Sequence, residues 1–172
     1  YGLDLMLQKK YGDFSWWLAY SFSQAPRMFE NNGLVEKYQS ANSRMHDMKI
    51  VGIWNINDKW TCSSSFVYAS GAPYTGIKSA MVLGENVLVN YGKHNGCKYP
   101  DYHRLDLGIN FHFDRRKGRY GEHLLSVGFY NVYNHQNPFY VYVEYDYQNK
   151  KRVLNQVSLF PILPSISYTF RF

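Results

Sequence analysis

The chain has 172 residues, enough for one domain or part of a larger one, and aromatic residues make up 19% of it, a high share for a soluble domain. The formal net charge of +6 comes partly from the local cluster "DRRKGR" (114–119) and not from a basic stripe, which argues against nucleic acid as a partner. Cys62 and Cys97 make no disulfide framework, no metal-ligand spacing occurs, and no apolar run is long enough for a transmembrane helix.

Apolar and polar residues alternate with period two along the chain, whereas helical periodicity is weak. The clearest run is 104–113, where one side holds only apolar residues and the other holds Arg104, Asp106, Gly108, Asn110 and His112. The pattern predicts seven β-strands, at residues 2–8, 14–22, 47–56, 59–70, 104–113, 123–133 and 165–172.

The connections between these strands are short and long in strict alternation. The long ones cover residues 23–46, 71–103 and 134–162. Long loops are uncommon in compact soluble domains, whereas outer-membrane barrels have short turns at one end and long loops at the other. In the last long connection, apolar runs on both sides of "QNKK" predict a β-hairpin. The sequence therefore predicts an all-β fold, a transmembrane antiparallel β-barrel segment with long extracellular loops and short periplasmic turns.

Several aromatic residues stand next to the predicted short turns. Trp54, Trp60, Phe113 and the terminal Phe172 share the parity of their apolar neighbours. Amphipathic aromatic rings are favoured where a membrane meets water, so these residues are predicted interface aromatics. The alternative is that they belong to the core of a soluble sandwich.

Seven antiparallel strands cannot close on themselves, because the first and last run parallel. Since open strand edges are not tolerated in lipid, we expect further strands before Tyr1 to complete the barrel. The chain starts without a signal peptide and its first residues already have a strand pattern, which indicates a piece of a longer protein.

Six segments together resemble a known family: "YSFSQAPRMFE" (20–30), "MHDMKIVGIWNINDKW" (45–60), "YASGAPYTG" (68–76), "YHRLDLGINFHF" (102–113), "LSVGFYNVYNHQNPF" (125–139) and "VSLFPILPSISYTFRF" (157–172). In order and spacing they resemble the C-terminal end of a TonB-dependent outer-membrane receptor. The similar branch carries a carboxypeptidase-regulatory-like domain at its N-terminus and includes the SusC-like proteins. The resemblance implies a barrel of 22 strands filled by a plug domain, with residues 1–172 supplying the last seven strands or so.

The resemblance also implies a function and partners. The receptor would lie in the outer membrane of a Gram-negative bacterium and take up a scarce nutrient (glycan, peptide or metal chelate). Its partners would be lipid, its own plug domain and remaining strands, the inner-membrane energy-coupling protein and a surface-exposed lipoprotein. Phe170 and Phe172 would occupy the aromatic positions of the C-terminal signal read by the barrel-assembly machinery, and Ser165 its polar one, although Ser167 stands where glycine is usual.

The polar row of the fifth predicted strand contains the candidate site residues Arg104, Asp106, Asn110 and His112. Charged groups inside a barrel usually pair, so the row either holds the plug or neighbouring strands, or contacts ligand. His112 shares this side with Asp106 but has no nucleophile beside it in the sequence, so we expect no enzymatic activity. No cofactor or metal is predicted.

Two other functions remain open on the sequence alone. The first is a passive porin-like channel or an adhesin barrel, which would lack the plug. The second is a soluble all-β binding module, such as a lectin. The loops mix aromatic rings, amides and charges, and this composition suits either sugars or anionic chelates.

Overall fold

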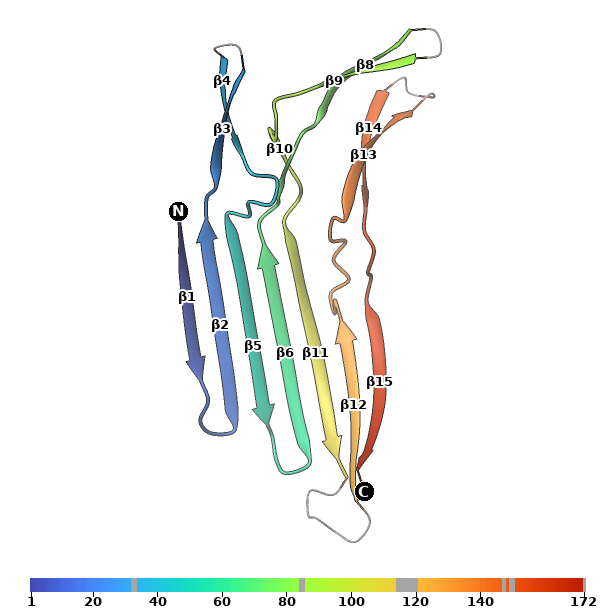
Figure 1. The fold of residues 1–172 in the computed structure, drawn as a ribbon. Helices are drawn as coiled ribbons and strands as arrows, with labels where there is room; N and C mark the ends of the chain where they lie inside the picture. The colour runs from blue at the N-terminus through green and yellow to red at the C-terminus, as the bar shows by residue number, and fades with distance from the viewer. Residues whose placement is uncertain (32–33, 84–85, 114–120, 147, 149–150, 172) are drawn as a thin grey trace.

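The computed structural model describes residues 1–172 except 32–33, 84–85, 114–120, 147, 149–150 and 172. Its main element is a seven-stranded antiparallel sheet in the order β1-β2-β5-β6-β11-β12-β15 (Figure 1). All seven predicted strands are confirmed, and each pairs with the next one along the sheet. The strands are β1 (Gly2–Lys9), β2 (Phe14–Ser23), β5 (His46–Asn55), β6 (Trp60–Ala69), β11 (Tyr102–His112), β12 (Glu122–Tyr130) and β15 (Leu163–Arg171).

Four further strand pairs extend from one end of the sheet, which we call the loop end; the opposite end, with the short turns, is the turn end (Figure 1). The hairpin of β13 (Tyr140–Asp146) and β14 (Lys151–Val157) confirms the one predicted around "QNKK". The other pairs lie in segments that the sequence left as loops. They are β3 (Pro26–Asn31) with β4 (Leu34–Gln39), β8 (Ile77–Leu83) with β9 (Asn86–Tyr91), and β7 (Pro73–Tyr74) with β10 (Cys97–Lys98).

The register gives the sheet one mainly apolar face and one mainly polar face, which we call the apolar and the polar face; the polar face also carries Met6, Trp17, Val51 and Ile53. Directly opposite residues share a face, and the alternation of each strand stays in phase with its neighbours across all six pairings. The apolar face is open to its surroundings, because no second layer covers it in the described part of the chain. The exposed large side chains that its strands contribute are Leu3, Leu5, Leu7, Phe14, Ile50, Trp54, Trp60, Leu107, Ile109, Phe129, Ile166, Tyr168 and Phe170.

The described residues contain no hydrophobic core of the usual kind. Their buried positions are Thr61, Ala69, Gly71, Pro73 and Asn131, none of which carries a large apolar side chain. A soluble domain normally encloses its large apolar residues. In this part of the chain they lie instead on an open face. No helix among the described residues is long and apolar enough to cross a membrane.

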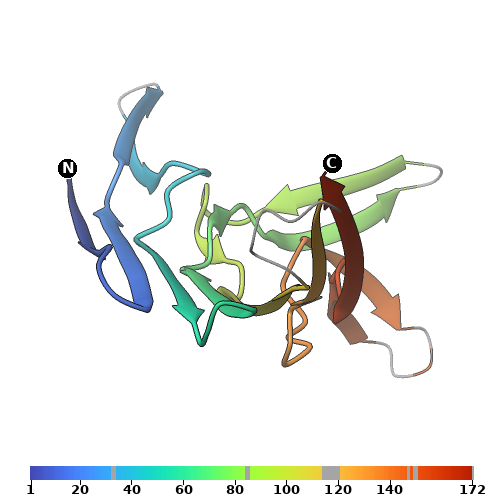
Figure 2. The same cartoon turned by 90° about the horizontal axis from the view of Figure 1, so that it is seen from below.

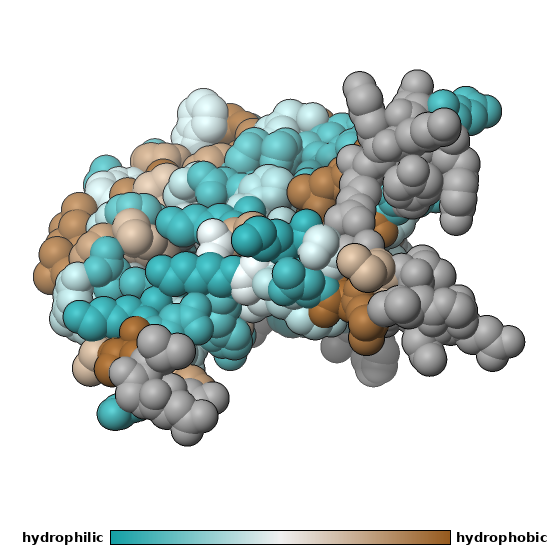
Figure 3. Space-filling view, turned by 90° about the horizontal axis from the view of Figure 1, so that it is seen from above, coloured by the Kyte–Doolittle hydropathy of each residue, from teal (hydrophilic) through white to brown (hydrophobic). Residues whose placement is uncertain are grey.

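The sheet curves from β1 to β15 into an open trough, and its two edges do not meet (Figure 2). Viewed from the loop end, hydrophilic residues gather over the middle, with hydrophobic residues along much of the left margin (Figure 3). The structure therefore shows an antiparallel all-β sheet, and no closed barrel is formed by the described residues.

The sixth strand is shorter than predicted. The alternation continues to residue 133, but β12 ends at Tyr130 because Asn131 adopts the left-handed conformation, with φ of 54°. Asparagine tolerates this conformation better than most residues, since its short side chain can hydrogen-bond locally. The chain bends there into the connection that leads to β13.

Candidate functional site

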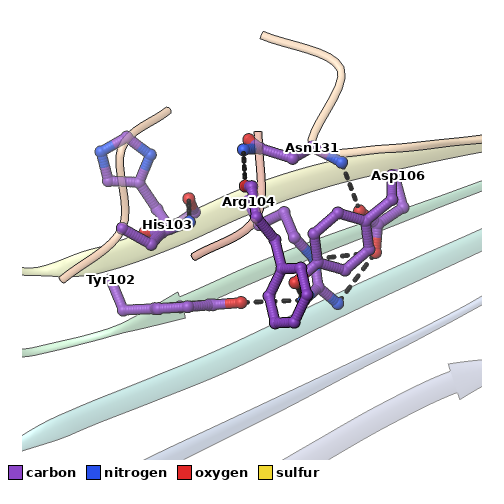
Figure 4. A network of polar contacts seen from close by, with 8 residues as sticks. Tyr102, His103, Arg104, Asp106 and Asn131 are labelled. Carbon is purple, nitrogen blue, oxygen red and sulfur yellow. Dashed lines mark hydrogen bonds and ion pairs between the residues drawn. The ribbon is translucent and has the colours of Figure 1, made fainter. Parts of the chain in front are cut away.

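A network of polar contacts joins the start of β11 to the end of β12, at the loop end of the sheet. Figure 4 shows this network from close by. Arg104 Nη2 lies 2.9 Å from Asp106 Oδ2, and Arg104 Nε donates to the same oxygen at 3.0 Å. Arg104 Nη1 donates to the hydroxyls of Tyr102, at 2.8 Å, and Tyr130, at 2.5 Å. The guanidinium carbon also lies 4.0 Å from the centre of the Tyr130 ring. The charge of Arg104 is thereby balanced by Asp106, and its side chain is held in place on the sheet.

The second oxygen of Asp106 joins this network to the loop after β12. Asp106 Oδ1 accepts a hydrogen bond of 2.9 Å from the backbone N–H of Asn131. The fully enclosed Asn131 side chain donates to the carbonyls of His135, at 2.9 Å, and Phe160, at 3.0 Å, and accepts from the His135 N–H at 3.0 Å. The ion pair on the sheet and the loop of the β12–β13 connection therefore form one hydrogen-bonded unit.

Two more asparagines fasten the same loop. Asn137 bonds both backbone groups of His103, accepting from its N–H and donating to its carbonyl, each at 2.9 Å. Asn134 Oδ1 accepts from the Ile162 N–H at 3.1 Å. Side-chain amides thus take the place of the backbone partners that a continued strand would have offered. Asn131, Asn134 and Asn137 follow one another at intervals of three residues, and this spacing is the sequence signal that could have indicated the loop.

Only two of the four candidate site residues belong to this network. Asn110 and His112 lie further along β11, opposite Ser126 and Leu124, toward the turn end. Neither makes a side-chain hydrogen bond within the described part of the chain. The row is therefore divided between the Arg104–Asp106 ion pair at one end and two polar groups at the other. The sequence missed Tyr102, Tyr130 and Asn131, whose roles depend on how the loop folds back.

A second polar cluster fixes the start of the β6–β11 connection. Asp101 accepts from the Tyr68 hydroxyl at 2.7 Å and from the Gly71 N–H at 2.9 Å. The Tyr68 hydrogen bond, and after it the Gly71 hydrogen bond, lowers the pKa of Asp101 below its usual range. A β-carbon on Gly71 would lie 1.7 Å from the Tyr99 carbonyl oxygen, so only glycine fits where these two segments meet.

Aromatic rings cross the apolar face near the turn end. Trp60 contacts Phe111 with ring centres 4.5 Å apart, and Phe111 contacts Phe113 at 4.8 Å. His123 stacks on Phe170 at 4.7 Å and is hydrogen-bonded to Tyr168. We call Trp54, Trp60, Phe111, Phe113, His123, Tyr168 and Phe170 the turn-end belt. The predicted interface aromatics Trp54, Trp60 and Phe113 all lie in it, half exposed, while Phe172 lies outside the described residues.

A second belt, which the sequence did not indicate, lies at the loop end of the same face. The Tyr20 hydroxyl bonds His46 Nδ1 at 2.8 Å, and the His46 ring lies 5.5 Å from that of Phe22. His103 Nδ1 bonds the Tyr133 hydroxyl at 2.9 Å. Burial, and after it the Asp106 carboxylate, raises the pKa of Tyr133. The loop-end belt consists of Tyr20, Phe22, His46, Tyr68, His103 and Tyr133.

The described residues contain no cluster of three or more His, Cys, Asp or Glu side chains that could hold a metal ion. No protein-family model, curated protein or solved structure matches the chain. The geometry of the sheet and its loops, together with the sequence resemblance, therefore bears on the function of the chain.

Proposed function

We propose that this chain is the C-terminal part of a TonB-dependent transporter barrel in a bacterial outer membrane. The observation that carries the proposal is the apolar face, which continues through all seven strands and has no covering layer among the described residues. Lipid is the occupant that suits such a face, because transmembrane strands are apolar outward and polar inward. The polar face would then line the inside of the barrel.

The spacing of the two aromatic belts supports this assignment. His103 of the loop-end belt lies in β11, and Phe113 of the turn-end belt directly follows the end of β11, ten residues further along the chain. Ten steps of an extended strand cover about 33 Å. At the tilt of about 40° common in transmembrane barrels this gives a height of about 25 Å, the usual height of the outward apolar band. Leu105, Leu107 and Ile109 occupy the interval between the belts.

The open edges of the sheet support closure by further strands. The six antiparallel pairings make β1 and β15 run in the same direction, so these edges cannot pair with each other as antiparallel neighbours. Unpaired backbone groups are costly in lipid. In the proposed barrel, additional strands pair with both edges and a plug domain fills the interior.

Transport itself is supported by the resemblance to TonB-dependent receptors. In that function, ligand binds among the hairpins of the loop end, and an inner-membrane coupling protein supplies the energy for passage. The Arg104–Asp106 pair would hold the β12–β13 loop against the barrel wall, because both ions already have protein partners. We propose no enzymatic activity.

Lipid contact can be tested by fluorescence quenching in bilayers made with brominated acyl chains. Trp54 and Trp60 lie on the apolar face, whereas Trp17 lies on the polar face. In each of the variants Trp54→Phe and Trp60→Phe, we expect a decrease in the part of the tryptophan fluorescence that brominated lipid quenches. Trp17→Phe is the matched control. It should decrease only the part of the fluorescence that brominated lipid does not quench. Equal quenching of all three, or a protein that stays in buffer without detergent, would contradict the membrane assignment.

A second arm of the test separates a plugged transporter from a passive channel. The native protein, extracted in detergent, is reconstituted into a planar bilayer and its conductance is recorded. A barrel filled by a plug should show no steady open conductance. Large, stable conductance steps would instead support the porin-like alternative.

A further inference from the structure

A groove lies between the β3–β4 hairpin and the loop at residues 92–96. Its described lining consists of Phe29, Glu36, Tyr38 and His94, and its volume is about 310 Å³. This volume is at the lower end of the range for small-molecule sites. The groove is separate from the Arg104 network.

Hydrogen bonds and a ring contact join the two walls of the groove, so the site is preformed. Asn95 Nδ2 donates to the Gln39 carbonyl at 2.7 Å, and the Asn95 N–H donates to Thr75 Oγ1 at 3.0 Å. The His94 N–H donates to Glu36 Oε1 at 3.4 Å, and the His94 ring meets the Tyr38 ring edge-on at 4.4 Å. Ligand binding would therefore require little loss of conformational entropy, because the two segments are already ordered.

The chemistry of the lining combines a carboxylate with aromatic rings. Phe29 stands directly opposite Glu36 in the hairpin register, and Tyr38 follows Glu36 by two residues on the same face. Glu36 has no ion-pair partner among the described residues, and its single hydrogen bond leaves Oε2 available. Aromatic faces and a carboxylate both attract a positively charged group of low hydration.

We propose that this groove binds an organic cation, a methylated ammonium or a guanidinium, through Glu36 with Phe29 and Tyr38 beside it. Binding rests on the groove alone, and the claim that the cation is the transported substrate rests also on the proposed function. Arg27 lies on the same hairpin face, opposite Tyr38, and opposes the cation. The net attraction is therefore modest, and a compact cation fits better than a highly charged one.

The test measures binding of choline to the detergent-solubilised protein by calorimetry. Its neutral isostere 3,3-dimethylbutan-1-ol keeps the shape and lacks the charge, so it should bind at least about fivefold more weakly. Glu36→Gln should weaken choline binding by about fivefold. Glu30→Gln removes the same charge from the opposite face of the same hairpin, and should leave choline binding unchanged.

Two further variants examine the aromatic and repulsive parts of the site. Phe29→Leu should weaken choline binding while leaving binding of the neutral isostere nearly unchanged, and Arg27→Gln should strengthen choline binding. Equal binding of choline and its isostere, or equal effects of Glu36→Gln and Glu30→Gln, would overturn the proposal. Choline binding without choline uptake by intact cells that carry the protein would leave the groove established and count against its role in transport.

Discussion

Asn131 shows how one side chain can end a strand and anchor the loop that follows. It is fully enclosed, has φ of 54°, and uses its amide for three hydrogen bonds to backbone groups. The alternating pattern around it predicts a longer strand, because alternation records only which face a residue takes. The alternating pattern carries no information about a side-chain amide that replaces backbone partners. It therefore predicts the strand but not the residue at which the strand ends.

Substitution of Asn131 should separate the hydrogen bonds from the backbone conformation. Asn131→Gly tolerates the positive φ and loses the three bonds, so we expect a loss of about 2–4 kcal/mol in the free energy of unfolding. Asn131→Ala loses the same bonds and adds about 1 kcal/mol of backbone strain. The measurement is urea-induced unfolding in detergent.

The exposed Asn57, which caps a turn-end connection through the N–H groups of Lys59 and Trp60, provides the comparison. Asn57→Gly should cost clearly less than Asn131→Gly, because water can replace its bonds. Similar losses at both sites would mean that the enclosed network adds no special stability.

At the scale of elements, the seven strands of the sheet and one hairpin of the loop end can be predicted from the sequence, and the other strand pairs of the loop end cannot. The seven strands follow from alternation that one register keeps in phase, and this information is local. The β13–β14 hairpin was also predicted, because two apolar runs flank a polar turn. The β3–β4 and β8–β9 hairpins lack so regular a pattern; β8 pairs with β9 through a register irregularity between Ile77 and Ser79.

The short pairing of β7 with β10 depends on one close approach, which gives the prediction at this scale. A β-carbon on Gly71 would overlap the Tyr99 carbonyl oxygen, so Gly71→Ala must push the two segments apart. We expect faster amide exchange at Tyr99, whose N–H is bonded to the Ala72 carbonyl at 3.0 Å. Hydrogen exchange read by mass spectrometry can measure this change.

Gly52→Ala is the matched control for the same chemical change. Its added methyl group would meet the Phe14 ring at 3.4 Å, an ordinary contact. Exchange in β5 should therefore change little. Unchanged exchange at Tyr99 in Gly71→Ala would show that the loop adjusts without losing the β7–β10 pair.

At the scale of the whole molecule, the candidate site residues illustrate what spacing can establish. The row from Arg104 to His112 shares one face, as its period requires, yet Asp106 and Asn110 are about 13 Å apart along the strand. A shared face therefore does not make a shared site. The ion pair is hydrogen-bonded to a loop whose position depends on contacts between residues far apart in the sequence. The apolar face, in contrast, extends across every strand and can be predicted from the sequence alone.

The edge strand β1 shows whether further strands complete the sheet. Every second N–H of β1 points away from β2, and in the described structure it meets no further strand. If additional strands complete a barrel in the native protein, these amides should exchange about as slowly as those of β5, which lies between β2 and β6. The measurement is hydrogen exchange of the bilayer-embedded native protein, with the turn at residues 10–13 as the fast reference. If the outward β1 amides exchange as fast as those of this turn, the edge of the sheet stays open. The proposal of a closed barrel would then be wrong.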